Sequence, residues 1–128
     1  MSIERLLSSA GVKYRLHRIN GNVSYVEFEN EFLIIIIKSK DNVFKIKRKD
    51  FYVIDDLLLP YVFLLIDERD EKKYLIKVSE PANFVRNAFD NTSKDEIFFG
   101  KQVLQKKIND ITLIDEIKKI GGAKKWLK

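Results

Sequence analysis

The densest group of chemically capable side chains is a run of four cations, Lys45, Lys47, Arg48 and Lys49. Lys and Arg stay charged at neutral pH, which suits them to neutralising phosphates. If Val43 to Lys49 is a strand, Lys45, Lys47 and Lys49 point to one side, about 6–7 Å apart. That spacing approximates successive phosphates and predicts contacts to a nucleic-acid backbone rather than to bases. The alternative interpretation is an exposed edge strand that lysines guard against pairing.

Two more cations, Arg15 and Arg18, lie in the same half of the chain, and we add them to the predicted nucleic-acid contacts. Residues 1–50 carry ten Lys/Arg against six Asp/Glu, residues 51–100 six against ten, and residues 101–128 eight against three. The two ends are therefore basic and the middle is acidic, which favours a polyanionic partner. The alternative is a Lys-rich surface typical of proteins that work at high temperature.

Length and residue types exclude several classes of site. The 128 residues fit a single domain, residues 1–128. The absence of Cys excludes disulfides, thiol catalysis and Cys-based zinc sites, and the single His17 is expected to form a hydrogen bond on a strand. Apolar runs such as Leu33–Ile37 are far shorter than the roughly 20 residues of a membrane span. With no signal peptide at the start, these features predict a cytoplasmic protein without a membrane partner.

The first half of the chain reads as a helix followed by three strands. Ser2 is a cap and Gly11 a stop for a helix at residues 3–10. Alternation of apolar and polar residues then predicts strands at residues 14–19, 23–28 and 32–38. The third strand contains four consecutive β-branched residues, Ile34 to Ile37, so we expect it to be central and buried on both faces.

The second half predicts further strands and helices. In order, the expected elements are a strand at 43–49, a helix capped by Asp50 and closed by Pro60, strands at 61–66 and 74–78, a helix opening near Pro81, a helix opened by the Ser93–Glu96 capping box, and a last helix marked by Leu113, Ile117 and Ile120 that stops at Gly121-Gly122. The expected fold is α/β, with a mixed central β-sheet flanked by helices. Residues 79–128 are expected to form a helical C-terminal extension of the core at residues 1–78.

Two residues connect this order of elements to a known family. Glu4 lies near the start of the first helix, and Lys38, followed by Ser39, ends the central strand. In this order and spacing, residues 1–78 resemble the PD-(D/E)xK nuclease core, specifically that of the archaeal Holliday junction resolvases. The resemblance implies a restriction-endonuclease-like fold, a homodimer that binds DNA, and Glu4 and Lys38 at catalytic positions. In that family, carboxylates and a Lys hold Mg²⁺ and activate water.

The chain departs from that family at two acids. The residue two positions before Lys38 is Ile36, and the Asp expected to open the hairpin falls near Val23 or Ser24. Because Mg²⁺ needs hard oxygen ligands, Glu4 and Lys38 alone predict no metal site and no cofactor. The resulting expectation is a catalytically inactive relative, not an enzyme, that still binds DNA or another nucleic acid.

Two alternatives stay open. In the first, Glu27, Glu29 or Glu31 supplies the lost charge, and the chain is an active DNA endonuclease with a rearranged site that uses Mg²⁺. In the second, the apolar segments 84–89 and 98–99 hold a protein partner, and the chain is a non-catalytic interaction subunit.

Overall fold

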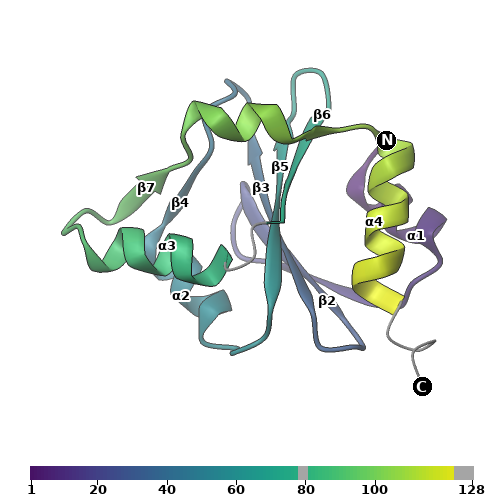
Figure 1. Cartoon of the computed structure of the whole chain (residues 1–128), viewed down its shortest axis with the longest axis horizontal. Helices are drawn as coiled ribbons and strands as arrows, with labels where there is room; N and C mark the ends of the chain where they lie inside the picture. The colour runs from purple at the N-terminus through teal and green to yellow at the C-terminus, as the bar shows by residue number, and fades with distance from the viewer. Residues whose placement is uncertain (78–80, 123–128) are drawn as a thin grey trace.

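The computed structural model describes residues 1–77 and 81–122, with helices on both faces of a mixed β-sheet (Figure 1). The predicted α/β class is confirmed. The elements are α1 (Ile3–Ala10), β1 (Tyr14–Arg18), β2 (Val23–Phe28), β3 (Leu33–Ser39), β4 (Lys45–Lys47), α2 (Arg48–Asp55), β5 (Tyr61–Asp67), β6 (Lys72–Ile76), α3 (Pro81–Asp90), β7 (Glu96–Phe98), η1 (Lys101–Lys106), β8 (Lys107–Ile108) and α4 (Asp110–Gly122). Val78, the last residue of the strand predicted at 74–78, and residues 79–80 and 123–128 of the predicted extension lie outside the described residues.

The main sheet has six strands in the order β1-β2-β3-β5-β6-β8. Strands β1, β2 and β3 form an antiparallel meander, in which Val23 lies opposite Ile37. The chain then returns through α2, so that β5 runs parallel to β3 with Ile66 beside Lys38. Strands β6 and β8 continue antiparallel to the far edge. A separate two-stranded sheet pairs β4 with β7.

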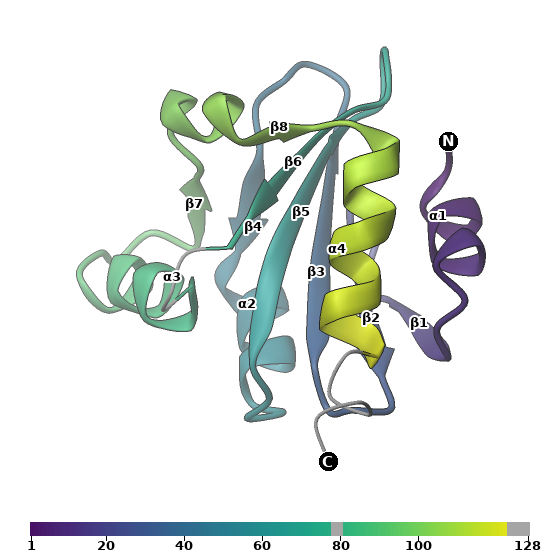
Figure 2. The same cartoon turned by 45° about the vertical axis from the view of Figure 1, so that its right-hand side comes forward.

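The sheet divides the interior into two hydrophobic cores. Ile34 and Ile36 of β3 pack with residues of α1 and α4, and Ile35 and Ile37 pack on the opposite face with residues of α2 and α3. Figure 2 shows α1 and α4 on one side of the sheet and α3 on the other. The prediction of a central strand buried on both faces is confirmed, because β-branched side chains that alternate between two cores meet no water.

The strand predicted at residues 43–49 is shorter than expected. Strand β4 ends at Lys47, and helix α2 begins at Arg48, so Asp50 lies inside the first turn and is not the cap. The reason is a helical stripe: Phe51 and Ile54, three positions apart, are both fully buried against the sheet. The Asp50 carboxylate instead accepts a hydrogen bond from Asn20 Nδ2 at 2.8 Å.

The C-terminal part was predicted to be helical, but it also contains the strands β7 and β8. The Ser93–Glu96 pattern does not open a helix, and Glu96 begins strand β7, which pairs with β4. Strand β8 also joins the main sheet at β6. Ile97 and Phe99 pack into the core on the α2/α3 side, and that alternation requires extended backbone. Tertiary pairing therefore prevails over the local capping signal.

Helix α4 ends at Gly122, in agreement with the predicted stop at Gly121-Gly122, and Gly121 is also a packing residue. It lies buried within α4, and a Cβ at this position would come 2.8 Å from Cδ1 of Phe28. Helix α4 therefore approaches β2 closely only because residue 121 has no side chain. Among the described residues, no helix is long and apolar enough to cross a membrane.

Candidate functional site

The structure brings Glu4 and Lys38 together. Glu4 lies in the first turn of α1, which Ser2 caps by accepting a hydrogen bond from the Arg5 amide. Lys38 lies near the carboxyl end of β3, and both side chains line the same two adjoining surface pockets. Arg18 lines one of these pockets as well, so two cations and a carboxylate converge there. We call this place the Glu4–Lys38 site.

The positions of the missing acids follow from strand alternation. Ser24 lies opposite Ile36 in the β2–β3 ladder, and Ser24, Ile36 and Lys38 belong to the face that α1 covers. Val23 packs into the opposite core, so Ser24 is the residue at the expected Asp position. The Ile36 side chain is 0% exposed and packs against other apolar side chains. A hydroxyl and a buried alkyl group therefore occupy the two positions at which the resemblance implies carboxylates, and these residues do not fit Mg²⁺.

Two glutamates that we did not predict also line a pocket with Glu4 and Lys38. These are Glu68 and Glu71, from the turn between β5 and β6. That turn lies beside the site because β5 runs parallel to β3 and both strands end at one edge. No sequence pattern distinguishes these two acids, because acidic residues are common in polar hairpin turns of every kind. Within residues 1–77 and 81–122, no three His, Asp or Glu side chains are placed to hold a metal ion together.

The hairpin acids of the rearranged-site alternative lie elsewhere. Glu27 belongs to the α2/α3 face of β2, and its Oε1 lies 3.1 Å from Nε2 of His17, which forms the expected contact on a strand. Glu29 and Glu31 follow β2 and precede β3, at the opposite end of β3 from Lys38. These three acids therefore lie away from the Glu4–Lys38 site.

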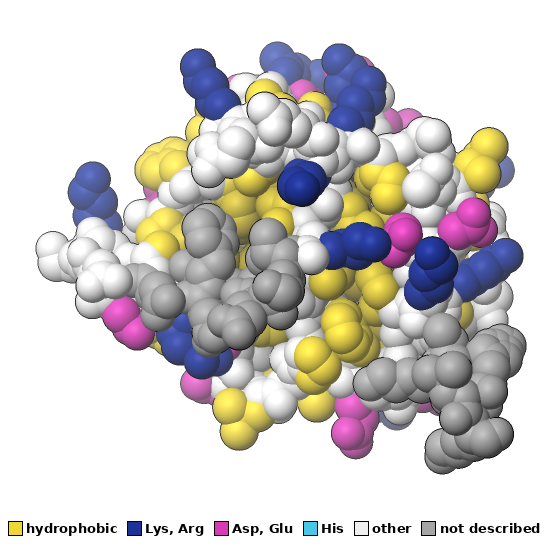
Figure 3. Space-filling model, viewed as in Figure 1, with side chains coloured by type: hydrophobic (Ala, Val, Ile, Leu, Met, Phe, Trp, Pro, Cys, Tyr) yellow, Lys and Arg dark blue, Asp and Glu magenta, His cyan; other side chains and the backbone are white. Residues whose placement is uncertain are grey.

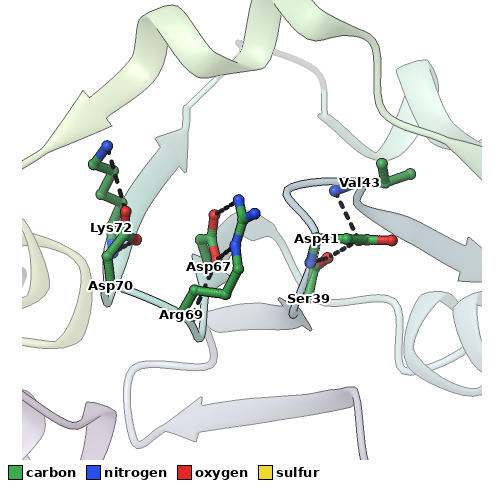
Figure 4. Close-up of polar contacts among 7 residues, drawn as sticks. All are labelled: Ser39, Asp41, Val43, Asp67, Arg69, Asp70 and Lys72. Atoms are coloured by element: carbon green, nitrogen blue, oxygen red, sulfur yellow. Dashed lines mark hydrogen bonds and ion pairs between the residues drawn. The ribbon is translucent and has the colours of Figure 1, made fainter.

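A second polar cluster occupies the same sheet edge on its other face (Figure 4). Asp67, predicted to start a loop, is the last residue of β5 and only 2% exposed. Arg69 binds its carboxylate through Nε at 3.1 Å and Nη2 at 2.7 Å. Ser39 donates a 2.6 Å hydrogen bond to Asp41. Asp67 therefore already has a cationic partner and lies on the face away from Lys38.

The Arg69–Asp67 pair predicts a pH-dependent stability. Hydrogen bonds from Arg69 hold the pKa of Asp67 below its ordinary value. The pair therefore stabilises the fold above the unfolded pKa of about 3.9, and this contribution is lost as pH falls through the folded value. Arg69→Gln should lower the free energy of unfolding at neutral pH, with a smaller difference near pH 3, roughly one unit below that unfolded value. Urea unfolding at both pH values measures this, and an unchanging difference would contradict it.

The basic run does not form one continuous strand face. Lys45 and Lys47 are exposed on β4, on either side of the buried Ile46, but Lys49 projects from the first turn of α2. Lys47 and Lys49 still line one surface hollow, together with Glu96. We call Lys45, Lys47 and Lys49 the lysine face. Lys45 Nζ lies 3.8 Å from Glu96 Oε1, a contact between partly exposed groups that contributes little to stability.

Arg48 has a structural role that the sequence did not reveal. Its Nη2 donates to the backbone carbonyls of Phe89, Thr92 and Lys94, at 3.1, 2.8 and 2.8 Å. The guanidinium carbon also lies 4.9 Å from the centroid of the Phe89 ring. Arg48 therefore joins the start of α2 to the end of α3, and we remove it from the predicted phosphate contacts.

Arg48→Ala should reduce the free energy of unfolding by about 2 kcal/mol, because charged hydrogen bonds to three carbonyls are lost. Lys49→Ala, at the next position and exposed, is the matched control and should change stability by less than about 0.5 kcal/mol. Denaturant unfolding of both variants measures the difference. Equal stability of the two variants would show that the Arg48 contacts do not hold α2 to α3.

The remaining predicted cations are spread over the surface. Arg15 and Arg18 are both exposed on β1, but alternation places them on opposite faces of the sheet. Figure 3 shows Lys and Arg side chains scattered over one face of the molecule, some along its edge and others near its middle among hydrophobic side chains. The chain matches no protein-family model, no curated protein and no solved structure.

Proposed function

We propose that this chain is a nucleic-acid-binding protein with a restriction-endonuclease-like core, and a catalytically inactive relative of the Holliday junction resolvases. The observation that carries the proposal is the Glu4–Lys38 site. A family-type Glu and Lys meet there at a sheet edge, while Ser24 and Ile36 stand where two carboxylates are needed. A retained frame around lost metal ligands is what loss of catalysis would leave behind.

The order of elements supports the nuclease-like core. Helix α1 precedes the β1–β2–β3 meander, α2 crosses over, and β5 returns parallel to β3 before β6 closes the sheet. This is the order on which the resemblance depends. Lys38, near the end of β3, lies on the sheet face that α1 covers and lines two pockets together with Glu4.

The binding part of the proposal depends on exposed cations. The lysine face presents three ammonium groups, and Arg18 adds a guanidinium beside the Glu4–Lys38 site. Such groups bind the phosphates of a nucleic acid whatever its base sequence, because binding releases counterions. The expected ligand is therefore recognised by the charge of its backbone.

The test is a series of gel shifts with four-way junction, duplex and single-stranded DNA at graded salt. We expect binding at low salt that weakens linearly on a log–log plot, with a slope of about −0.9 per phosphate contact on duplex. A chain that binds none of the three forms at low salt would refute the proposal.

The interaction-subunit alternative has less support in the described side chains. Phe89 and Phe99 are buried, and of segment 98–99 the aromatic ring offered to a partner is that of Phe98. Copurification from native cells separates the two proposals. A stable protein partner without nucleic acid would favour the interaction subunit.

A further inference from the structure

Phe98 is an exposed aromatic side chain beside the lysine face. Its residue is 60% exposed on β7, directly opposite Lys45 in the β4–β7 ladder. Lys45 Nζ lies 5.8 Å from the centroid of the Phe98 ring, within the range of a cation–π contact. Glu96, opposite Lys47, lies on the same outer face of this small sheet. An aromatic ring and two cations thus share one short surface.

The outward position of Phe98 is imposed by its neighbours. Ile97 lies opposite Ile46 and turns inward with it. Phe99 is 9% exposed and packs edge-on against Phe63, with ring centroids 5.3 Å apart. Its amide also donates to the Phe44 carbonyl at 2.8 Å. Because both neighbours are anchored, the ring at position 98 already lies on the surface before a ligand binds. Binding therefore does not require the backbone there to be reordered.

We propose that Phe98 is a stacking platform for an unpaired base, with Lys45, beside the ring, and Lys47, two residues further along β4, binding phosphates of the same strand. The ligand is single-stranded nucleic acid, and this inference rests on the proposed function. A duplex hides the faces of its bases within its own stack, whereas a single strand can lay one on an aromatic ring. The position of Phe98 on β7, across from Lys45 of β4, provides both attractions at one place.

The ion pair between Lys45 and Glu96 fits this assignment. At 3.8 Å, with both side chains partly exposed, it holds the ammonium near the Phe98 ring while no ligand is bound. A phosphate carries a full negative charge and can replace the carboxylate as the partner of Lys45. Exposed pairs of this kind are weak, so the exchange has little energetic cost.

The experiment measures affinity by fluorescence anisotropy, with a labelled oligothymidylate and a matched duplex at several salt concentrations. Phe98→Ala should weaken oligothymidylate binding by roughly 5- to 150-fold, as expected for the loss of one stacked base. Duplex affinity and the salt slope should stay unchanged, because the lysines remain. Phe98→Trp should preserve the affinity, and Phe98→Leu, which keeps bulk without a ring, should lose it. Ile111→Ala, an exposed apolar deletion on α4, is the matched control.

Each outcome decides the matter. Oligothymidylate binding that is unaffected by Phe98→Ala, or lost equally for oligothymidylate and duplex, overturns the stacking platform and leaves the proposed function in place. If the unaltered chain binds neither the oligothymidylate nor the duplex, the proposed function itself is overturned. Thermal melting of each variant identifies a folding defect, and the contrast between Phe98→Trp and Phe98→Leu still decides between stacking and bulk if Phe98→Ala unfolds.

Discussion

Replacing Lys45, Lys47 and Lys49 together by alanine should lower affinity for duplex DNA by about two to three orders of magnitude near 0.1 M salt. The slope of log affinity against log salt should fall by up to about 2–3 units, at about 0.9 per phosphate contact. Sequence preference should change little, because backbone contacts position a protein and carry no base information. Anisotropy titrations over a salt series measure all three quantities.

The structure indicates that this variant will fold. Lys45 and Lys47 alternate with the buried Ile46 and touch water, and Lys49 is exposed on α2, so each replacement should cost no more than about 0.5 kcal/mol. A matched triple variant at Lys107, Lys118 and Lys119, all exposed on β8 and α4, is the control for net charge. If both triples lower the slope equally, the binding surface is not the lysine face.

Ile36→Glu should lower the free energy of unfolding by more than about 3 kcal/mol, because a carboxylate would replace a fully buried alkyl group. Burial should raise the pKa of the new carboxyl above that in the unfolded chain. The folded state then binds more protons, so the loss of stability should be largest above the raised pKa and shrink as pH falls. Denaturant unfolding across pH measures this.

This prediction tests whether the core tolerates a carboxylate at position 36. Ile36→Val, which removes one methylene, should cost only about 0.5–1.5 kcal/mol and is the control for volume. An Ile36→Glu variant as stable as the unaltered chain would show that the position tolerates a carboxylate. The core around α1 and α4 would then not account for the absence of an acid there.

Elements decided by local patterns were predicted well from the sequence. The cap and stop of α1 at Ser2 and Gly11, and the bounds of β2, agree with the structure. The run Ile34 to Ile37 correctly indicated a strand buried on both faces. In each case the signal is contained within a few adjacent residues, so no distant partner is needed to interpret it.

The predictions fail where contacts with residues far away in the sequence determine the local structure. Arg48 is helical and not part of the predicted strand, because Phe51 and Ile54 of the same helix pack into the core. Its guanidinium donates hydrogen bonds to carbonyls more than 40 positions away. The Ser93 capping pattern yields to β4–β7 pairing. The close packing of Gly121 against Phe28 was not predicted either. None of these contacts is visible in a local window.

The candidate site was predicted in part. The pairing of Glu4 with Lys38 came from a resemblance in order and spacing, and both residues line common pockets. The choice between Val23 and Ser24 was open in the sequence, since it depends on which face of β2 points toward α1. Glu68 entered the site only through the parallel pairing of β3 with β5, which no short pattern encodes.

The most direct test of the central claim incubates the chain with a labelled four-way DNA junction in Mg²⁺ and, separately, in Mn²⁺. The same samples are then run on native and denaturing gels. Our account predicts a shifted band on the native gel and intact strands on the denaturing gel. Cut strands that persist in repurified protein, and disappear in Lys38→Ala, would show a working nuclease and contradict the claim that catalysis is lost. An unshifted junction at low salt would contradict the claim of binding.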